Sequence, residues 1–221
     1  MSVTVRAGNF DAIRIIAAGS VIFSHAFIIA EGHENNEPFV KLLGKGNILG
    51  IYGVFVFLIV SGFLVAQSLH TSPSLGVFLW KRFLRIYPGL TGCALFSALV
   101  IAPFFAVDEV AASLYQYLAY VLKTLSLQDP KFISGVVFYP SGDNIGSIIN
   151  GSLWTIRQEV ACYLVLALCA ICGLCNLSVA LTGLVATSLL VYFNIWPPSP
   201  FLGGLLLCLP SFLGGVLMYF C

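Results

Sequence analysis

Long apolar segments alternate with short polar segments along the chain, and the apolar segments have the length that a helix needs to cross a bilayer. They cover residues 10–28, 48–69, 87–107, 152–173, 177–193 and 201–221. A shorter helical pattern at 111–127 contains Lys123 and is expected at the membrane interface. The pattern predicts five or six spans in an all-α fold, a polytopic transmembrane helix bundle that forms a single domain over residues 1–221.

The polar segment at residues 70–88 predicts the orientation of the spans. It contains three cations directly before an apolar segment, namely Lys81, Arg82 and Arg85. The positive-inside rule places this segment in a cytoplasmic loop. The first apolar segment is too long for the core of a signal peptide, so we expect an uncleaved first span with a cytoplasmic amino terminus that includes Arg6.

The other polar segments are then expected outside the membrane, on the far side. Residues 31–47 are mixed in charge and are predicted to be a loop. Asp108 and Glu109 follow the third span. Residues 128–151 are rich in turn-forming residues, among them Ser141 to Asn144, and are expected to cover a site on the outer face.

The first apolar segment contains three polar side chains that suggest chemistry inside the membrane. Arg14 and His25 are eleven residues apart, which on a helix is three turns plus about 20°, so they share one face about 16 Å apart along the axis. Asp11 lies one turn before Arg14 and is placed to pair with it. A charge within a span normally faces the protein interior or a wet cavity. The alternative is that Arg14 extends to the headgroups and His25 lies at the opposite interface.

Composition agrees with a membrane protein and excludes other classes. Of the 221 residues 59% are hydrophobic and 9% are charged, whereas about a quarter of a soluble domain is charged. The net charge of +1 says nothing about nucleic acid, but the absence of a basic cluster with interleaved exposed aromatics argues against nucleic-acid binding. The seven cysteines all fall in predicted helices, so we assign neither a disulfide framework nor a metal site to them, although Cys169, Cys172 and Cys175 have a CxxCxxC spacing.

Three further segments carry candidate functional residues, each with a plain structural alternative. Ser61 and Gly62 in the second span allow close helix contact. Arg82 and Arg85, one turn apart, are placed to bind one anion together, or they only mark the cytoplasmic side. Glu159 lies inside the fourth span, where Ser152 is expected to cap the helix; alternatively Glu159 pairs with Arg157 at the membrane edge.

Four short motifs, in this order, resemble those of the membrane-bound acyltransferase 3 family. They are Phe-Asp-Ala-Ile-Arg followed by Ser-His at 10–25, the apolar run ending Ser-Gly-Phe at 53–63, Lys-Arg-x-x-Arg-x-x-Pro at 81–88, and Ser-Leu-x-x-x-x-x-Glu-x-x-x-Tyr at 152–163. Two positions depart from the pattern: Ala12 replaces the usual glycine, and Phe55 stands where many members have an aspartate. The resemblance covers the whole chain.

The resemblance implies an acyltransferase that moves an acyl group, expected to be acetyl, from acyl-CoA to a sugar hydroxyl of a surface or exported glycan. Acyl-CoA is then a co-substrate and no cofactor or metal is expected. His25 is the expected base, or a carrier of the acyl group, and Glu159 orients it or holds the sugar. Arg14, with Asp11 fixing its rotamer, holds the donor's carbonyl or pantetheine end.

The same resemblance implies that Lys81, Arg82 and Arg85 bind the donor phosphates, and that Ser61 and Tyr163 support the site. A bacterial inner membrane is the expected location. Family members have about ten spans, so the chain is expected to be an amino-terminal fragment. Two alternatives stay open: a secondary transporter that uses Arg14, His25 and Glu159 as a polar relay, and an inactive remnant.

Overall fold

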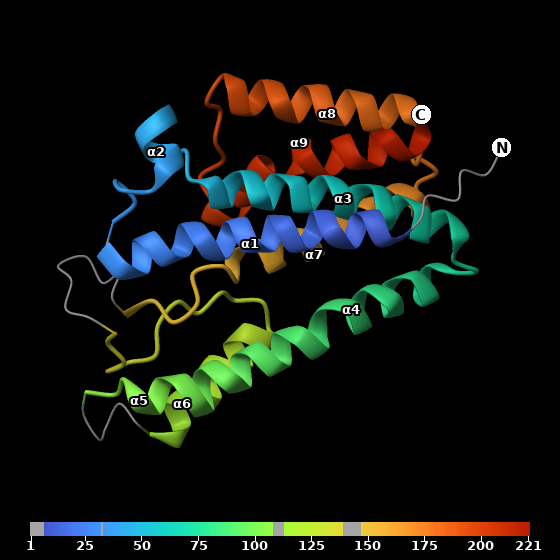
Figure 1. Cartoon of the computed structure of the whole chain (residues 1–221). Helices are drawn as coiled ribbons and strands as arrows, with labels where there is room; N and C mark the ends of the chain where they lie inside the picture. The colour runs from blue at the N-terminus through green and yellow to red at the C-terminus, as the bar shows by residue number, and fades with distance from the viewer. Residues whose placement is uncertain (1–6, 32, 108–112, 139–146) are drawn as a thin grey trace. The chain divides into compact units, whose positions relative to one another are not determined.

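The structure, a computed structural model, describes residues 7–31, 33–107, 113–138 and 147–221. The described residues form helices and one isolated bridge, between Ala106 and Val136, with no strand among them. Five helices are long and apolar enough to cross a membrane: Phe10–Glu31, Leu49–Thr71, Leu75–Phe104, Trp154–Ile171 and Pro200–Phe220. Figure 1 shows these helices, and their length and apolar composition confirm an all-α, multi-pass membrane protein.

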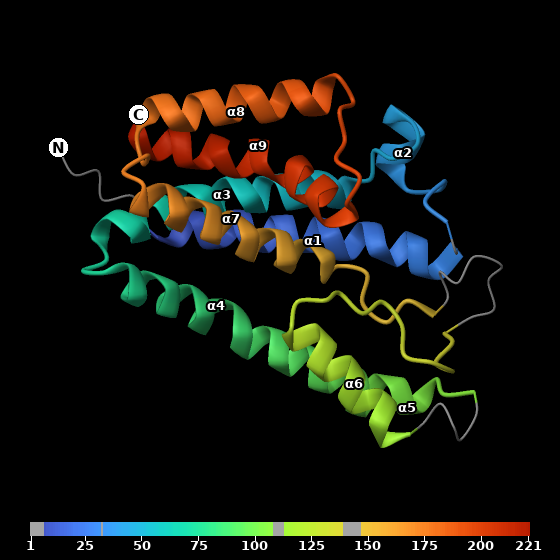
Figure 2. The ribbon, with the colours of Figure 1, turned by 180° about the vertical axis from the view of Figure 1, so that it is seen from behind.

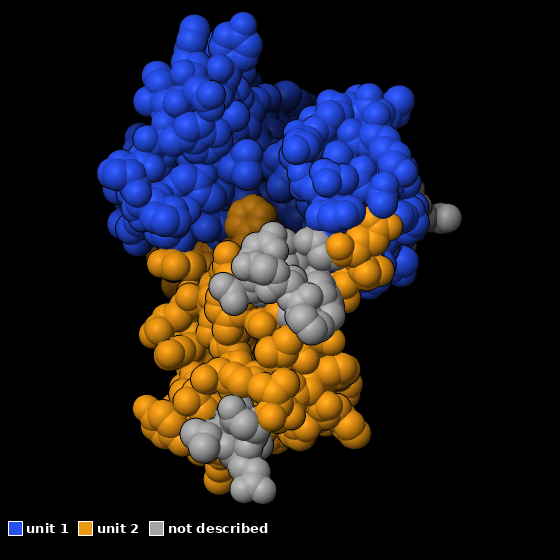
Figure 3. Space-filling model, turned by 90° about the vertical axis from the view of Figure 1, so that its left-hand side faces the viewer, with its two compact units in different colours: residues 1–28, 33–73, 158–221 blue, residues 29–32, 74–157 orange. Residues whose placement is uncertain are grey.

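The chain forms two compact units, coloured separately in Figure 3. The first consists of residues 1–28, 33–73 and 158–221, and the second of residues 29–32 and 74–157. The first unit holds most of α1 (Ala7–Glu31), α2 (Pro38–Leu43), α3 (Leu49–Thr71), most of α7 (Trp154–Ile171), α8 (Leu177–Tyr192) and α9 (Pro200–Phe220). The second holds α4 (Leu75–Phe96), η1 (Ser97–Ile101), α5 (Ala102–Phe104) and α6 (Leu114–Leu125).

Glycines bring α3 and α9 of the first unit into direct backbone contact. A Cβ atom added at Gly62 would overlap the carbonyl oxygen of Phe212, and one added at Gly215 would overlap the carbonyl oxygen of Ile59. Small residues are how membrane helices approach closely, because lipid gives no hydrophobic drive for them to associate. The predicted structural use of the Ser61–Gly62 pair is therefore confirmed for Gly62.

Helix α1 runs antiparallel to α3, side by side in Figures 1 and 2. The contacts pair late positions of one helix with early positions of the other. The Gly50 N–H donates to Ser24 Oγ at 2.7 Å, Gly53 lies against Ala17 and Ser20, and the Phe10 and Phe63 rings are 5.3 Å apart. This pairing gives a register that relates depth along α1 to depth along α3.

Glu37, whose side chain is buried, links α1, α2 and α3 at the end of α1 that carries His25. Its carboxylate accepts the N–H groups of Phe39, Val40 and Leu49 at 2.7–3.0 Å, and the Ser24 hydroxyl at 3.1 Å. These contacts satisfy backbone donors that the first turns of α2 and α3 leave without an intrahelical partner. Burial raises the pKa of this carboxyl, but the hydrogen bonds from Leu49, Val40, Ser24 and Phe39 outweigh it and the pKa is lowered.

The Glu37→Gln variant is expected to unfold with a free energy about 1–2 kcal/mol lower at neutral pH, because an amide offers one acceptor oxygen where the carboxylate uses two. A lowered folded pKa contributes stability above the ordinary value of 4.5 and loses it as the pH falls through the folded value. Thermal unfolding of the detergent-purified proteins should therefore show a difference that shrinks below pH 4.5. Glu34→Gln, which removes a carboxylate bound to the Gly46 N–H, is the control. A difference that does not change with pH would contradict this account.

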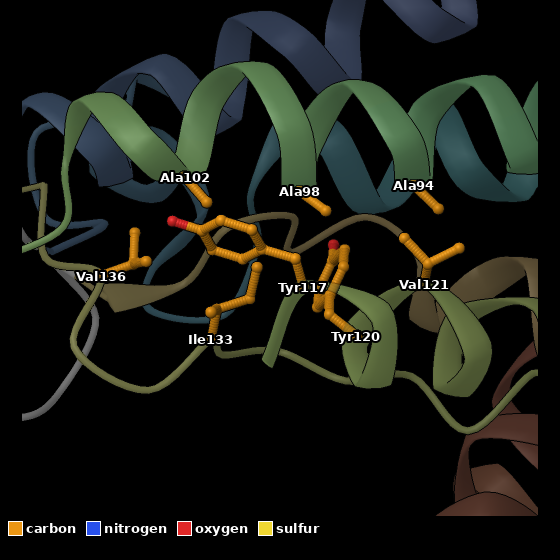
Figure 4. Packing of buried hydrophobic residues seen from close by; sticks show 8 residues of the cluster. All are labelled: Ala94, Ala98, Ala102, Tyr117, Tyr120, Val121, Ile133 and Val136. Carbon is orange, nitrogen blue, oxygen red and sulfur yellow. The ribbon is translucent and has the colours of Figure 1, made fainter. Parts of the chain in front are cut away.

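The second unit is built on one long helix that α4, η1 and α5 form together, with α6 packed along it. Figure 4 shows Ala94, Ala98 and Ala102 on one side and Tyr117 and Tyr120 on the other. The alanines leave room for the two rings to lie against the long helix, with Val121, Ile133 and Val136 filling the rest of this core.

The structure corrects several predicted boundaries. Residues 70–88 are not a loop: α3 continues to Thr71 and α4 starts at Leu75, because the Ser74 hydroxyl accepts the Val77 N–H and caps it. Residues 31–47 include the short helix α2, which Glu37 caps and Pro38 begins. The Ser152 hydroxyl does not cap α7 but donates to Asn150 Oδ1 at 2.8 Å.

Other predictions concern cysteines and the connectors. Cys172, Cys175 and Cys221 lie outside helices, so the expectation that all seven cysteines are helical was wrong for these three. All seven are free thiols. The predictions for Arg6, for Asp108 and Glu109, and for Ser141–Asn144 lie outside the described residues.

Candidate active site

Arg14 and His25 lie on the same side of α1, as their spacing predicts, and both are half-buried. The α1 face that contacts α3 carries Ala17 and Ser24, and both Arg14 and His25 lie on one flank of that face. The Arg14 guanidinium carbon is 5.8 Å from the centre of the Phe57 ring on α3, which is cation–π range. Arg14 is thus directed at its own bundle within the first unit.

The His25 ring is held by its own helix in a way that determines its tautomer. Its Nδ1 atom lies 2.8 Å from the carbonyl oxygen of Val21. A carbonyl oxygen only accepts, so for this hydrogen bond Nδ1 must carry the proton. In the neutral ring Nε2 then has the free lone pair and can accept a proton, as a general base requires.

Glu159 lies in a buried polar cluster that joins α3 and α7. Ser61 Oγ donates to Glu159 Oε1 at 2.8 Å and lies 3.0 Å from the Tyr163 hydroxyl, and that hydroxyl donates to the same carboxylate oxygen. All three residues are at most 7% exposed. Three candidates from two distant motifs, 98 residues apart at their closest, therefore meet in one cluster. We call Ser61, Glu159 and Tyr163 the carboxylate cluster.

The register of α1 on α3 gives the depth of this cluster. Gly50 contacts Ser24, the neighbour of His25, whereas Ser61 is eleven residues further along α3, about 16 Å away at 1.5 Å per residue. Phe57, beneath Arg14, is one turn from Ser61. The carboxylate cluster therefore lies near the depth of Arg14 and about three turns from that of His25.

The three cations expected to bind the donor lie on α4, in the second unit. Lys81 and Arg85 are exposed, whereas Arg82 is half-buried with its guanidinium carbon 6.0 Å from the centre of the Phe78 ring. The motif that holds them is helical, as the anion-binding hypothesis requires of Arg82 and Arg85, which are one turn apart.

The remaining candidates are placed as follows. Asp11 is an exposed residue in α1, one turn before Arg14, so its proposed pairing stays a prediction. Glu159 projects from α7 toward Ser61, while Arg157, two positions earlier and so on a different helix face, lines a pocket of the second unit. The described residues hold no group of three or more potential metal ligands.

Sequence reasoning did not assign roles to Ser24 with Glu37, or to Asp129 with Arg157. The Glu37–Pro38 pair is a recognisable helix start, a capping acid before a proline, and could have identified the cap. No local signal predicts that the same carboxylate also binds Ser24, thirteen residues earlier, or that Asp129 and Arg157 border one pocket.

Comparisons with known proteins show which proteins this chain resembles. A family model described as an acyltransferase domain matches residues 8–220. Nodulation protein 10 of Rhizobium leguminosarum bv. viciae is 33% identical over 72% of the chain and 42% of its own length. An O-acetyl transferase of Shigella phage Sf6 is 30% identical over 71% of the chain and 44% of its own length. The chain thus matches less than half the length of each relative, and no solved structure matches it.

Proposed function

The chain belongs to the acyltransferase 3 family, and we propose that it is an integral-membrane O-acyltransferase that moves an acetyl group from acetyl-CoA to a sugar hydroxyl of a glycan. The relative described as an O-acetyl transferase supports the ester-forming chemistry. The observation that carries the proposal is the array of titratable groups in the first unit: an imidazole with an available Nε2, a guanidinium and a buried carboxylate.

His25 acts as the general base in the transfer. Its Nε2 takes the proton of the acceptor hydroxyl while the hydroxyl oxygen attacks the thioester carbonyl. The carbon–sulfur bond then breaks, the proton passes to the departing sulfur, and the products are an O-acetyl ester and free coenzyme A. The helix holds the imidazole in the required tautomer before any substrate binds, so little reorganisation is needed at the reaction.

Arg14 and the carboxylate cluster act on the donor's pantetheine arm and not on its thioester carbonyl. Arg14 and His25 are about 16 Å apart along α1, whereas reacting groups must come within about 3–3.5 Å of each other. One carbonyl therefore cannot contact both. The guanidinium of Arg14 donates to the amide carbonyls of the pantetheine arm. Glu159, near the depth of Arg14, acts on the same arm and does not orient His25.

The donor's phosphates bind to Arg85 and Lys81, which are exposed on α4, with Arg82 completing the charge. By the positive-inside rule, the start of α4 and the amino terminus then lie in the cytoplasm. The membrane in this proposal is the inner membrane of a bacterium. The partners are acyl-CoA, a glycan or glycolipid acceptor, and the surrounding lipid.

Membranes that contain the chain are expected to transfer label from radioactive acetyl-CoA to a glycan, and mild alkali should release the label because it cleaves acetyl esters and leaves amides intact. Membranes prepared without the chain are the control. Absence of label above this control, as expected for a transporter, or label that resists alkali would overturn the proposed function.

A further inference from the structure

The second unit has a pocket where α6 ends and α7 begins. Its apolar wall includes Leu90, Leu127 and Leu153, and its polar wall is formed by Thr124, Asp129 and Arg157. The pocket has room for a group the size of one water molecule and is partly open. None of its polar residues has a role in the transfer described above, so the pocket, called here the Asp129 pocket, needs its own explanation.

The backbone that carries Asp129 is strained. After α6 ends at Leu125, both Leu127 and Asp129 adopt left-handed conformations, with φ of 58° and 55°. Such a conformation costs about 1–2 kcal/mol for a residue such as Leu127 and less for an aspartate, and for Leu127 it persists only where the surroundings impose it. The two turns place Leu127 and Asp129 together in the wall of the pocket, and strain of this kind is concentrated at binding sites.

The electrostatic environment leaves the Asp129 carboxyl in need of hydrogen-bond donors. Burial raises its pKa, and the nearby charges of Lys131 and Arg157 lower it without offsetting the effect of burial. A carboxylate in this situation gains from a ligand that donates O–H groups, because each bond replaces water lost on burial. The guanidinium of Arg157 supplies N–H donors for an acceptor oxygen on the same ligand.

A row of hydroxyl groups continues the polar wall into the core. Thr124, 2% exposed, lines the pocket, and its buried hydroxyl has no hydrogen-bond partner among the described residues. The buried Tyr120 hydroxyl, near Thr124 and near Ser97 at the first position of the π-helical turn η1, is likewise unpartnered within the described part of the chain. π-Helical turns inside α-helices are frequent at functional sites. Carboxylate, guanidinium and hydroxyl groups beside leucine side chains suit a sugar, whose neighbouring hydroxyls both donate and accept and whose C–H faces are apolar.

We propose that the Asp129 pocket binds a hydroxyl of a neutral sugar, with Asp129 accepting the hydroxyl hydrogen and Arg157 donating to the oxygen beside it. The inference rests on the proposed function in one respect, that this sugar belongs to the acceptor. Asp129 and Arg157 are then specificity-determining residues, since a sugar without a hydroxyl at the matching position leaves both groups without their ligand partner.

Saturation-transfer NMR on the purified full chain in detergent, with methyl α-glucoside, methyl α-galactoside and methyl α-rhamnoside as probes, tests binding without any need for turnover. We expect at least one glycoside to bind, and Asp129→Asn to weaken that binding about 10- to 100-fold, which is the usual effect of removing a hydrogen bond to a charged group. Asparagine tolerates the left-handed conformation, so this variant keeps the backbone. Gln128→Ala, in the same turn but outside the pocket wall, should bind as the wild type does.

Thr124→Val, which has the same shape without the hydroxyl, gives a second test, and a loss of binding several-fold is expected. If no glycoside binds, or if Asp129→Asn binds as tightly as Gln128→Ala, the proposal is overturned. In the transfer assay, Asp129→Asn should raise the acceptor KM about tenfold and leave the KM for acetyl-CoA within twofold. Sugar binding without acetyl transfer would overturn the proposed function alone, whereas transfer with an unchanged acceptor KM would overturn the pocket's role alone.

Discussion

His25→Ala is expected to transfer acetyl groups at least about 100-fold more slowly than the wild type, because a positioned general base contributes a factor of 10² to 10⁴. The variant should insert and fold normally. The only hydrogen bond described for the ring is to the Val21 carbonyl, four residues earlier in the same helix, so its removal breaks no described hydrogen bond between helices. The rate of label transfer and the thermal midpoint, measured on the same preparation, check both statements.

His70→Ala is the control for the loss of a helix-bonded imidazole, and its thermal midpoint is measured as well because the His70 ring also packs against Tyr219 and Phe220 of α9. His70 lies on α3 with its Nδ1 atom 3.0 Å from the Ala66 carbonyl oxygen, which is the same local geometry as at His25. Its removal should leave the transfer rate within about twofold, since we assign it no role in the reaction. Added imidazole should restore part of the transfer activity of His25→Ala. It should leave the activity of His70→Ala unchanged. Wild-type activity in His25→Ala would refute the base assignment.

Alanine at Gly62 or Gly215 is expected to lower the free energy of unfolding by about 3 kcal/mol, near the upper end of the usual cost of overpacking. A new methyl group at either position meets a backbone carbonyl oxygen of the facing helix, which cannot rotate away as a side chain would. α3 and α9 would have to separate, and the contacts between them would be lost. Thermal unfolding in detergent should show both variants unfolding many degrees below the wild type.

Gly214→Ala provides the control, one residue away on the same helix. A Cβ atom at Gly214 meets nothing within 4 Å, so the substitution removes a helix-destabilising glycine without a clash. We expect it to be neutral or to stabilise the protein by up to about 1 kcal/mol. If Gly214→Ala were as damaging as Gly215→Ala, the cause would be the loss of glycine in general and not the contact with Ile59.

The close approach of α3 and α9 also explains why the Ser61–Gly62 pair suits the site. Gly62 faces the backbone of α9, while Ser61, the preceding residue, is directed to α7 and binds Glu159. The same turn of α3 therefore packs against α9 and forms a hydrogen bond with α7. A variant at Gly62 should lose activity in proportion to its loss of folded protein. Variants at His25 should lose activity while the amount of folded protein stays the same.

Much of this organisation follows from the sequence alone. The length and apolarity of each segment are sufficient to predict spans, because in lipid the backbone must satisfy its own hydrogen bonds and a helix does so locally. The shared face of Arg14 and His25 follows from helical periodicity within one element. The errors occur where a local pattern is ambiguous: the cationic residues 81–85 read as a loop, yet the Ser74 cap starts the helix before them.

Only the tertiary structure decided which distant residues meet. The sequence singles out Ser61, Glu159 and Tyr163, but their hydrogen bonds, and the depth of the cluster near Arg14 and three turns from His25, depend on how α3 packs against α1 and α7. Local patterns also do not predict the hydrogen bond between Ser24 and Glu37, and they do not predict the Asp129 pocket. The reason is physical: periodicity specifies the direction of a side chain about its own helix axis, whereas the register between helices is set by contacts such as Gly62 on Phe212, made between residues far apart in the chain.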